Sequence, residues 1–216
     1  MYPHLHEASH SKSLDQNMTA FEEFIRRYHI NEGFASKLHG LRGYEIVFLC
    51  DDSSSMNLPI GKKLISCTDL HFFYLLFEFE GHVYGAGQQQ ITRWEELKKT
   101  VSIVVDLAST VDPDGVDVYF LNRKPLLHVH NSKELVSTFA TRPNGATPIV
   151  RALRQVLNEK KNEIQQRKLL IVIATDGIPT DNNGQPNVQE FYQVLAKERI
   201  PIDRVPVTIM ACTGEY

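Results

Sequence analysis

Short hydrophobic runs alternate along the chain with longer segments in which apolar residues recur at helical spacing. Runs rich in β-branched and aromatic residues are typical of strands that are buried on both faces of a parallel sheet. The strands predicted on this basis are residues 44–50, 116–122, 168–175 and 205–212, with a weaker one at 126–130. The first run, YEIVFLC, stops at a group of small polar residues, where we expect the strand to end.

Three segments have the apolar spacing of amphipathic helices. The first covers residues 92–109 and begins with a capping box formed by Thr92 and Glu95. The second, residues 148–166, begins with a proline, which is favoured in the first turn of a helix, and the third is residues 187–199. Strands that alternate with helices of this length require right-handed crossovers. The sequence therefore predicts an α/β fold, with a mainly parallel sheet covered by helices on both faces.

The N-terminal part of the chain has a different pattern. Residues 1–17 are predicted to form a polar tail, because apolar periodicity begins only at Phe21. Residues 18–43 are predicted to form a helical extension. Thr19 and Glu22 provide a capping box at its start, and the apolar residues that follow share one helical face.

Composition excludes several classes of protein. The chain has 216 residues, 42% of them hydrophobic, and its 23 Lys and Arg against 26 Asp and Glu give a net charge of −3. The chain therefore has no excess of basic residues that would favour binding to the phosphate backbone of nucleic acid. Three cysteines without a CxxC pair favour a reducing compartment and suggest no zinc site. No apolar segment resembles a secretory signal or is long enough to span a membrane. We therefore expect a cytoplasmic protein without a membrane span and without a nucleic-acid partner.

Oxygen-bearing side chains follow two of the predicted strands and precede one of the predicted helices. They are Asp51, Ser53 and Ser55 of a DxSxS motif after the first strand, Thr147 before the second helix, and Asp176 after the strand that ends at residue 175. In a parallel sheet, ligands bind at the carboxyl ends of the strands, so these side chains are expected to converge. A donor set made only of oxygen suits a hard cation such as Mg²⁺, with Mn²⁺ or Ca²⁺ as substitutes, and disfavours zinc.

The DxSxS motif, the GATP loop that opens a helix and the TDGIPTD segment together resemble the von Willebrand factor type A domain and its metal-ion-dependent adhesion site. The resemblance runs from Tyr44 to the end of the chain. It implies a Rossmann-like fold at residues 44–216, with an insertion at about 57–91, and metal-dependent protein binding rather than catalysis. It also implies that Asp51, Ser53, Ser55, Thr147 and Asp176 hold Mg²⁺, and that the ion accepts an Asp or Glu of a protein partner. The edge strand and C-terminal helix usual in the family do not follow residue 212, so we expect a fold truncated at its C-terminus.

Other interpretations of the same residues remain open. Each serine, threonine and aspartate of the candidate site is also typical of an ordinary turn or helix cap. The acidic pair Asp51–Asp52 at the end of the first strand is compatible with a receiver-like or phosphotransfer domain. However, Asn122 stands where a receiver has its phosphate-accepting aspartate. No GxSxG motif supports a serine hydrolase. We therefore expect a binding module and not an enzyme, with an oligomeric state that the sequence leaves undefined.

Overall fold

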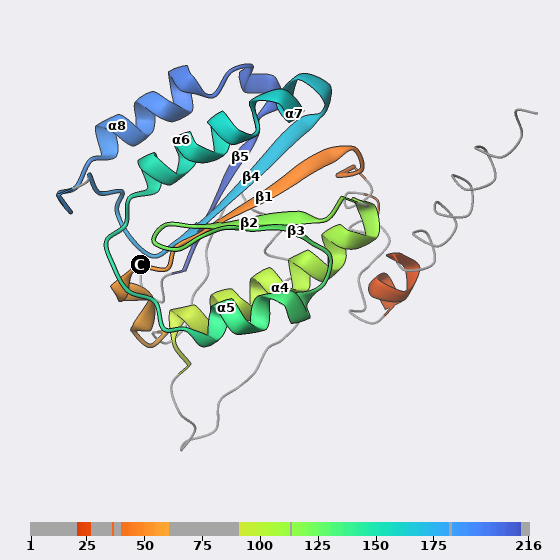
Figure 1. The fold of residues 1–216 in the computed structure, drawn as a ribbon, viewed down its shortest axis with the longest axis horizontal. Helices are drawn as coiled ribbons and strands as arrows, with labels where there is room; N and C mark the ends of the chain where they lie inside the picture. The colour runs from red at the N-terminus through yellow and green to blue at the C-terminus, as the bar shows by residue number, and fades with distance from the viewer. Residues whose placement is uncertain are drawn as a thin grey trace, which may run out of the picture.

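A five-stranded sheet with the order β3-β2-β1-β4-β5 lies at the centre of the fold (Figure 1). The computed structural model describes residues 21–26, 36, 40–60, 91–112, 114–181 and 183–212. The strands are β1 (Tyr44–Cys50), β2 (Val116–Phe120), β3 (Leu126–Val129), β4 (Lys168–Thr175) and β5 (Val207–Ala211). Strand β3 pairs antiparallel with β2, and the other three pairs are parallel. The predicted α/β fold with a mainly parallel sheet is therefore confirmed.

Strand β1 is the middle strand of the sheet. Its Val47 lies opposite Asp117 of β2 and Ile171 of β4. The last six residues of β1 are all buried, as expected for a continuous hydrophobic run between two neighbouring strands. Cys50 is the register partner of Ala174, so β1 and β4 end beside each other and the loops that follow them begin at the same edge.

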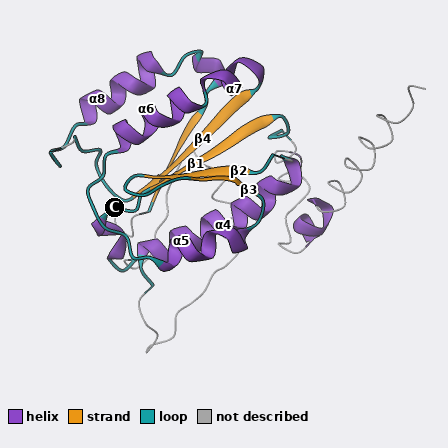
Figure 2. Ribbon diagram, in the orientation of Figure 1, coloured by secondary structure: helices purple, strands orange, loops and turns teal. Residues whose placement is uncertain are grey.

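Successive residues of β1 pack into two separate hydrophobic clusters, because side chains alternate between the two sides of a strand. Phe48 belongs to a cluster that also contains residues of α4 (Arg93–Val111) and α5 (Val136–Ala140). Leu49 belongs to a second cluster, with residues of α6 (Ile149–Glu159) and α7 (Lys161–Gln166). In Figure 2, α4 and α5 lie below the sheet in the view, and α6 and α8 (Val188–Gln193) lie above it.

Helix α4 begins where its sequence predicts. The Thr92 hydroxyl accepts a hydrogen bond from the Glu95 backbone N–H at 3.2 Å, and the Glu95 carboxylate accepts one from the Thr92 N–H at 2.9 Å. Both halves of the predicted capping box are therefore present. The helix continues to Val111, slightly beyond the predicted end.

The helix predicted at residues 148–166 is two helices. It breaks at Lys160, whose backbone has φ −89° and ψ 9° between α6 and α7. Lys160 is buried, and its ammonium group lies 2.9 Å from Glu45 and 2.5 Å from Asp117, both on strands of the sheet. The break coincides with these tertiary ion pairs, which a helical periodicity does not record. Pro148 takes the N-cap position rather than the first helical one.

The remaining elements are shorter than the sequence predicts or absent from that prediction. The helix expected at 187–199 consists of α8 (Val188–Gln193) and a π-helical turn, Val194–Glu198. Helix α5 follows a 3₁₀ turn at Ser132–Leu135 and was not predicted, because so short an element has no readable periodicity. Two further 3₁₀ turns are Ser54–Asn57 and Ile202–Arg204. Within the described residues, no helix has the length and hydrophobicity that a membrane crossing needs.

Part of the N-terminal extension can be compared with its prediction. Residues 21–26 are helical, and Phe21 and Phe24, which were predicted to share one helical face, are both buried. The predicted polar tail at 1–17 and most of the remaining extension lie outside the described residues.

The two ends of the predicted insertion meet. Most of it, residues 61–90, lies outside the described residues. Ile60 donates its backbone N–H to the Ile91 carbonyl at 2.9 Å, and Pro59 forms a β-bridge with Thr92. The described residues on either side of this segment are therefore in contact, between the 3₁₀ turn at Ser54–Asn57 and α4.

We expect the domain to fold without this segment. Replacing residues 61–90 by a short Gly-Ser linker should change the free energy of unfolding by no more than about 2 kcal/mol, because loop-closure entropy depends only weakly on loop length. Urea denaturation followed by circular dichroism measures this change. A variant in which the segment is replaced by Gly-Ser of equal length is the control. Loss of cooperative unfolding in the linker variant alone would contradict the expectation.

Candidate functional site

Two of the three loops that carry the candidate ligands begin side by side at one edge of the sheet. Asp51 directly follows β1, and its backbone N–H donates to the Ala174 carbonyl of β4 at 2.8 Å. Asp176 directly follows β4. Because β1 and β4 are parallel neighbours, their carboxyl ends bring these two aspartates into the same region, as the strand pattern predicts.

Four of the five candidate ligands form a continuous series of hydrogen bonds. Asp51 Oδ1 accepts from the Ser53 backbone N–H at 2.8 Å. The Ser53 and Ser55 hydroxyl oxygens lie 3.0 Å apart, within hydrogen-bond distance. Ser55 then donates its hydroxyl to Asp176 Oδ1 at 2.8 Å. Thr175 closes the other end of the series by donating its hydroxyl to Asp51 Oδ2 at 2.6 Å.

Thr147, the fifth candidate ligand, lies beside the loop that contains Asp176. Its backbone carbonyl accepts from the Thr180 N–H at 3.0 Å, and its own N–H donates to the Thr180 hydroxyl at 3.2 Å. A Cβ placed on Gly177 would lie 3.6 Å from the Thr147 hydroxyl oxygen. Thr147 is itself buried. The fold therefore brings all three predicted loops to one place, with Thr147 next to the residue that follows Asp176.

The loop before Thr147 is tied to the DxSxS loop by backbone and side-chain hydrogen bonds. Ser54 donates its N–H to the Gly145 carbonyl at 3.0 Å and its hydroxyl to Asn144 Oδ1 at 3.1 Å. Gly145 has φ +116°, and a Cβ there would lie 2.7 Å from the Asn122 side chain. This position therefore requires glycine. The contacts keep the second loop in place independently of any ligand.

The acidic pair Asp51–Asp52 is divided between two environments. Whereas Asp51 faces the serines, Asp52 accepts from the Asn122 backbone N–H at 2.8 Å and from Arg123 Nε at 2.6 Å. Asp52 is buried, and these bonds join the DxSxS loop to the loop after β2. The two neighbouring carboxylates thus have different partners and different roles in the structure.

Burial dominates the electrostatics of Asp51. Removal from water raises the pKa of the Asp51 carboxyl above its ordinary value, although hydrogen bonds from Ser53 and Thr175 act in the opposite direction. The negative charge of Asp176 raises this pKa further. A buried pair of carboxylates whose charged forms disfavour each other is stabilised by a nearby cation.

One cation of the chain is already in contact with this site, and the sequence analysis missed it. Arg93 donates from Nη1 to Asp176 Oδ2 at 2.6 Å, and the Asp176 side chain is fully buried. Arg93 is the first residue of α4, where a positive charge opposes the helix dipole. A basic residue at that position is a weak indication that the side chain has a partner elsewhere in the fold.

The donor set fits a small hard cation. Every candidate ligand atom is a hydroxyl or carboxylate oxygen, and such atoms are the ligands that Mg²⁺ and Ca²⁺ prefer. Across the described residues, no group of three or more His, Cys, Asp or Glu is placed to hold a metal ion. A metal site at this edge of the sheet therefore depends on the hydroxyls of Ser53, Ser55 and Thr147 as well as on two carboxylates.

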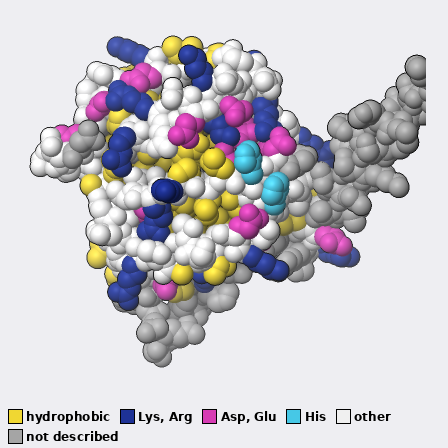
Figure 3. Space-filling view, viewed as in Figure 1, with side chains coloured by type: hydrophobic (Ala, Val, Ile, Leu, Met, Phe, Trp, Pro, Cys, Tyr) yellow, Lys and Arg dark blue, Asp and Glu magenta, His cyan; other side chains and the backbone are white. Residues whose placement is uncertain are grey.

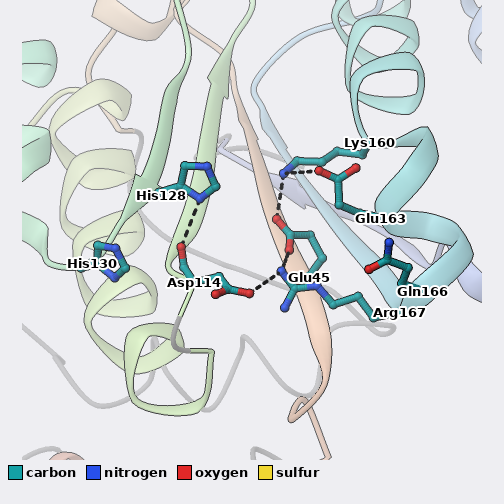
Figure 4. Close-up of a pocket in the computed structure, with 8 residues that line it drawn as sticks. All are labelled: Glu45, Asp114, His128, His130, Lys160, Glu163, Gln166 and Arg167. Carbon is teal, nitrogen blue, oxygen red and sulfur yellow. Dashed lines mark hydrogen bonds and ion pairs between the residues drawn. The ribbon is translucent and has the colours of Figure 1, made fainter.

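A pocket lies near the start of β1, at the end of that strand opposite the candidate site. Its volume is about 630 Å³, and its lining includes Glu45, Asp114, His128, His130, Lys160 and Arg167 (Figure 4). Lys160 and Arg167 both pair with Glu45, and Arg167 also pairs with Asp112 at 3.2 Å. On the surface, the two exposed histidines lie among acidic and basic side chains (Figure 3). The charged groups of this pocket are largely engaged with one another, which indicates a structural role.

The chain was compared with protein families and with curated proteins. A scan against protein-family models finds none that matches the chain, and a search of curated proteins finds no match either.

Proposed function

We propose that residues 44–216 form a von Willebrand factor type A-like domain, with helices on both faces of its sheet, that binds a divalent cation at the carboxyl edge. The proposed ligands are Asp51, Ser53, Ser55, Thr147 and Asp176, and the proposed ion is Mg²⁺ or, in its place, Mn²⁺ or Ca²⁺. The observation that carries this proposal is the 2.8 Å hydrogen bond between Ser55 and Asp176, which are 121 residues apart in the sequence. Such long-range convergence of oxygen donors is more than isolated turns or helix caps require.

The proposed activity is metal-dependent binding of a protein and not catalysis. A donor set with three neutral hydroxyls leaves a divalent ion incompletely neutralised, so the site attracts an acidic group. The proposed partner is therefore a protein that presents an Asp or Glu side chain. Two exposed apolar side chains lie on the loops that carry Ser55 and Asp176. They are Leu58, which is 50% exposed, and Ile178, which is 59% exposed. Their apolar surface can exclude water around the contact, which strengthens it.

Titration with Mg²⁺ tests the metal site. We expect the parent to bind Mg²⁺ in isothermal calorimetry and to melt at a higher temperature when the ion is present. An Asp51→Ala/Ser53→Ala variant should lose about 100-fold or more in affinity, and Thr147→Ala about tenfold, because each change removes an oxygen donor.

Ser137→Ala is the matched control, since Ser137 is exposed on α5 and its hydroxyl lies outside the site. It should bind Mg²⁺ as the parent does. A parent that gives neither heat of binding nor a thermal shift would rule out the proposed site. Equal affinities for the parent and the double variant would rule out the proposed ligands.

A receiver-like or phosphotransfer function is the second candidate, and the geometry supports it less. That function needs Asp51 and Asp52 to act together on one ion. Asp52 instead bonds to Asn122 and Arg123 in the loop after β2. Incubation with a small phosphodonor followed by intact-mass measurement distinguishes the two functions, because only a receiver-like domain would gain a phosphoryl group.

A further inference from the structure

The ion pair between Arg93 and Asp176 bears directly on how a cation could enter the proposed site. Resting on the proposed function, we infer that the guanidinium of Arg93 and the divalent cation compete for Asp176, so that Arg93 sets the affinity of the site for the metal. Arg93 thereby neutralises Asp176 when no metal is bound, and it lowers the affinity of the site for the metal ion.

The contacts of Asp176 carry this inference. Both carboxylate oxygens are engaged: Oδ1 accepts from the Ser55 hydroxyl at 2.8 Å, and Oδ2 accepts from Arg93 Nη1 at 2.6 Å. Since the Asp176 side chain has no exposed surface, its negative charge needs a cation within the protein. Arg93 meets this need when no metal is bound, and a divalent ion among the same oxygens would meet it instead.

The hold of Arg93 on Asp176 is limited. An arginine bound through two parallel N–H groups makes a strong pair with a carboxylate, but Arg93 uses only Nη1. Its Nε is buried and finds no hydrogen-bond partner among the described residues. The side chain also keeps 19% of its surface exposed, so it has a route to solvent. A guanidinium that makes one hydrogen bond to the described residues and keeps part of its surface exposed can be displaced by an ion of twice the charge.

Competition has a defined sign. The positive charge of Arg93 repels a cation that approaches Asp176. In addition, the Arg93 guanidinium must give up its ion pair with Asp176 when the metal ion binds. Both effects weaken metal binding. Removing the charge at position 93 should therefore strengthen the binding of Mg²⁺, whereas removal of a residue that merely positioned Asp176 would weaken it.

The test is calorimetric titration of the full chain with Mg²⁺. We expect Arg93→Gln to bind the ion about tenfold or more tightly than the parent, which corresponds to the loss of one repulsive charge contact. Arg93→Lys keeps the charge and should bind as weakly as the parent to within a few fold. Arg154→Gln removes the same charge from exposed ion pairs of α6 with Glu190 and Glu198, and it should leave the affinity unchanged.

Unchanged or weaker binding by Arg93→Gln, alongside measurable binding by the parent, overturns the inference and leaves the proposed function intact. Absence of Mg²⁺ binding by the parent overturns the proposed function itself, on which this inference rests. A measurement on the parent covers the case in which Arg93→Gln does not fold. The Nε–H resonance of Arg93 in an ¹⁵N spectrum should shift on saturation with Mg²⁺, because its guanidinium leaves Asp176. An Arg93 resonance that does not move at saturating Mg²⁺ overturns the inference.

Discussion

Replacement of Lys160 by methionine is expected to lower the free energy of unfolding by about 3–5 kcal/mol, because it leaves buried carboxylates without their cation. Lys160 lies between Glu45 and Asp117, both buried on neighbouring strands of the sheet. Glu45 keeps Arg167 as a partner, whereas the partner that Asp117 keeps among the described residues is the His128 backbone N–H, at 2.8 Å. Methionine preserves the length of the side chain, so the loss reports charge rather than packing.

The electrostatics of Lys160 support this expectation. Burial by itself lowers the pKa of its ammonium group, but hydrogen bonds and charge attraction from Asp117 and Glu45 outweigh burial, so the pKa lies above its ordinary value. The group is therefore charged in the folded protein at neutral pH. Urea denaturation at pH 7 measures the change, and Lys161→Met is the control, because Lys161 is the next residue and is exposed. A loss for Lys160→Met no larger than that of the control would show that the ion pairs contribute little.

Replacement of Arg123 by methionine is expected to cost about 3–4 kcal/mol of stability and to weaken any Mg²⁺ binding, because Arg123 joins the DxSxS loop to α5. Its Nε pairs with buried Asp52 at 2.6 Å, and its Nη1 donates to the Thr138 carbonyl at 2.8 Å. The guanidinium also lies over the Trp94 ring, 5.0 Å from its centroid. One side chain thus supports a loop, a helix end and part of the core.

Two further variants define the cause of that loss. Arg123→Lys keeps the charge but cannot reproduce the planar set of donors, so we expect it to recover only part of the stability. Arg142→Met removes an exposed arginine nearby and should change the free energy of unfolding by less than about 0.5 kcal/mol. Emission of Trp94, the single tryptophan of the chain, follows unfolding and the contact with Arg123 at the same time. Full recovery in Arg123→Lys would mean that charge alone matters at this position.

Local patterns predicted most of the elements. The runs at Tyr44–Cys50 and Lys168–Thr175 are strands with the predicted bounds. A short, continuous apolar run is typical of a strand in a parallel sheet, where both faces of the strand are buried. The capping box of Thr92 and Glu95 marks the start of α4 for an equally local reason. These features depend on residues within a few positions of one another, so one sequence is enough to predict them.

Contacts between distant residues could not be predicted in this way. The helix break at Lys160 coincides with ion pairs to Glu45 and Asp117, and neither partner is near it in the sequence. Arg93 was missed for the same reason, since its partner Asp176 follows it by 83 residues. The sequence also treats Asp51 and Asp52 as a pair, whereas neighbouring residues at the end of a strand point in different directions and find different partners.

For the candidate site, the sequence alone determined which oxygen-bearing side chains stand at the ends of which elements. That information lies in motif spacing and in the order of strands and helices. Only the tertiary structure decided that Ser55 meets Asp176, that Asp52 turns to Arg123, and that Arg93 supplies the cation now paired with the site. Buried charges take the nearest partner in space, and proximity in space is a property of the folded sheet rather than of the order of residues.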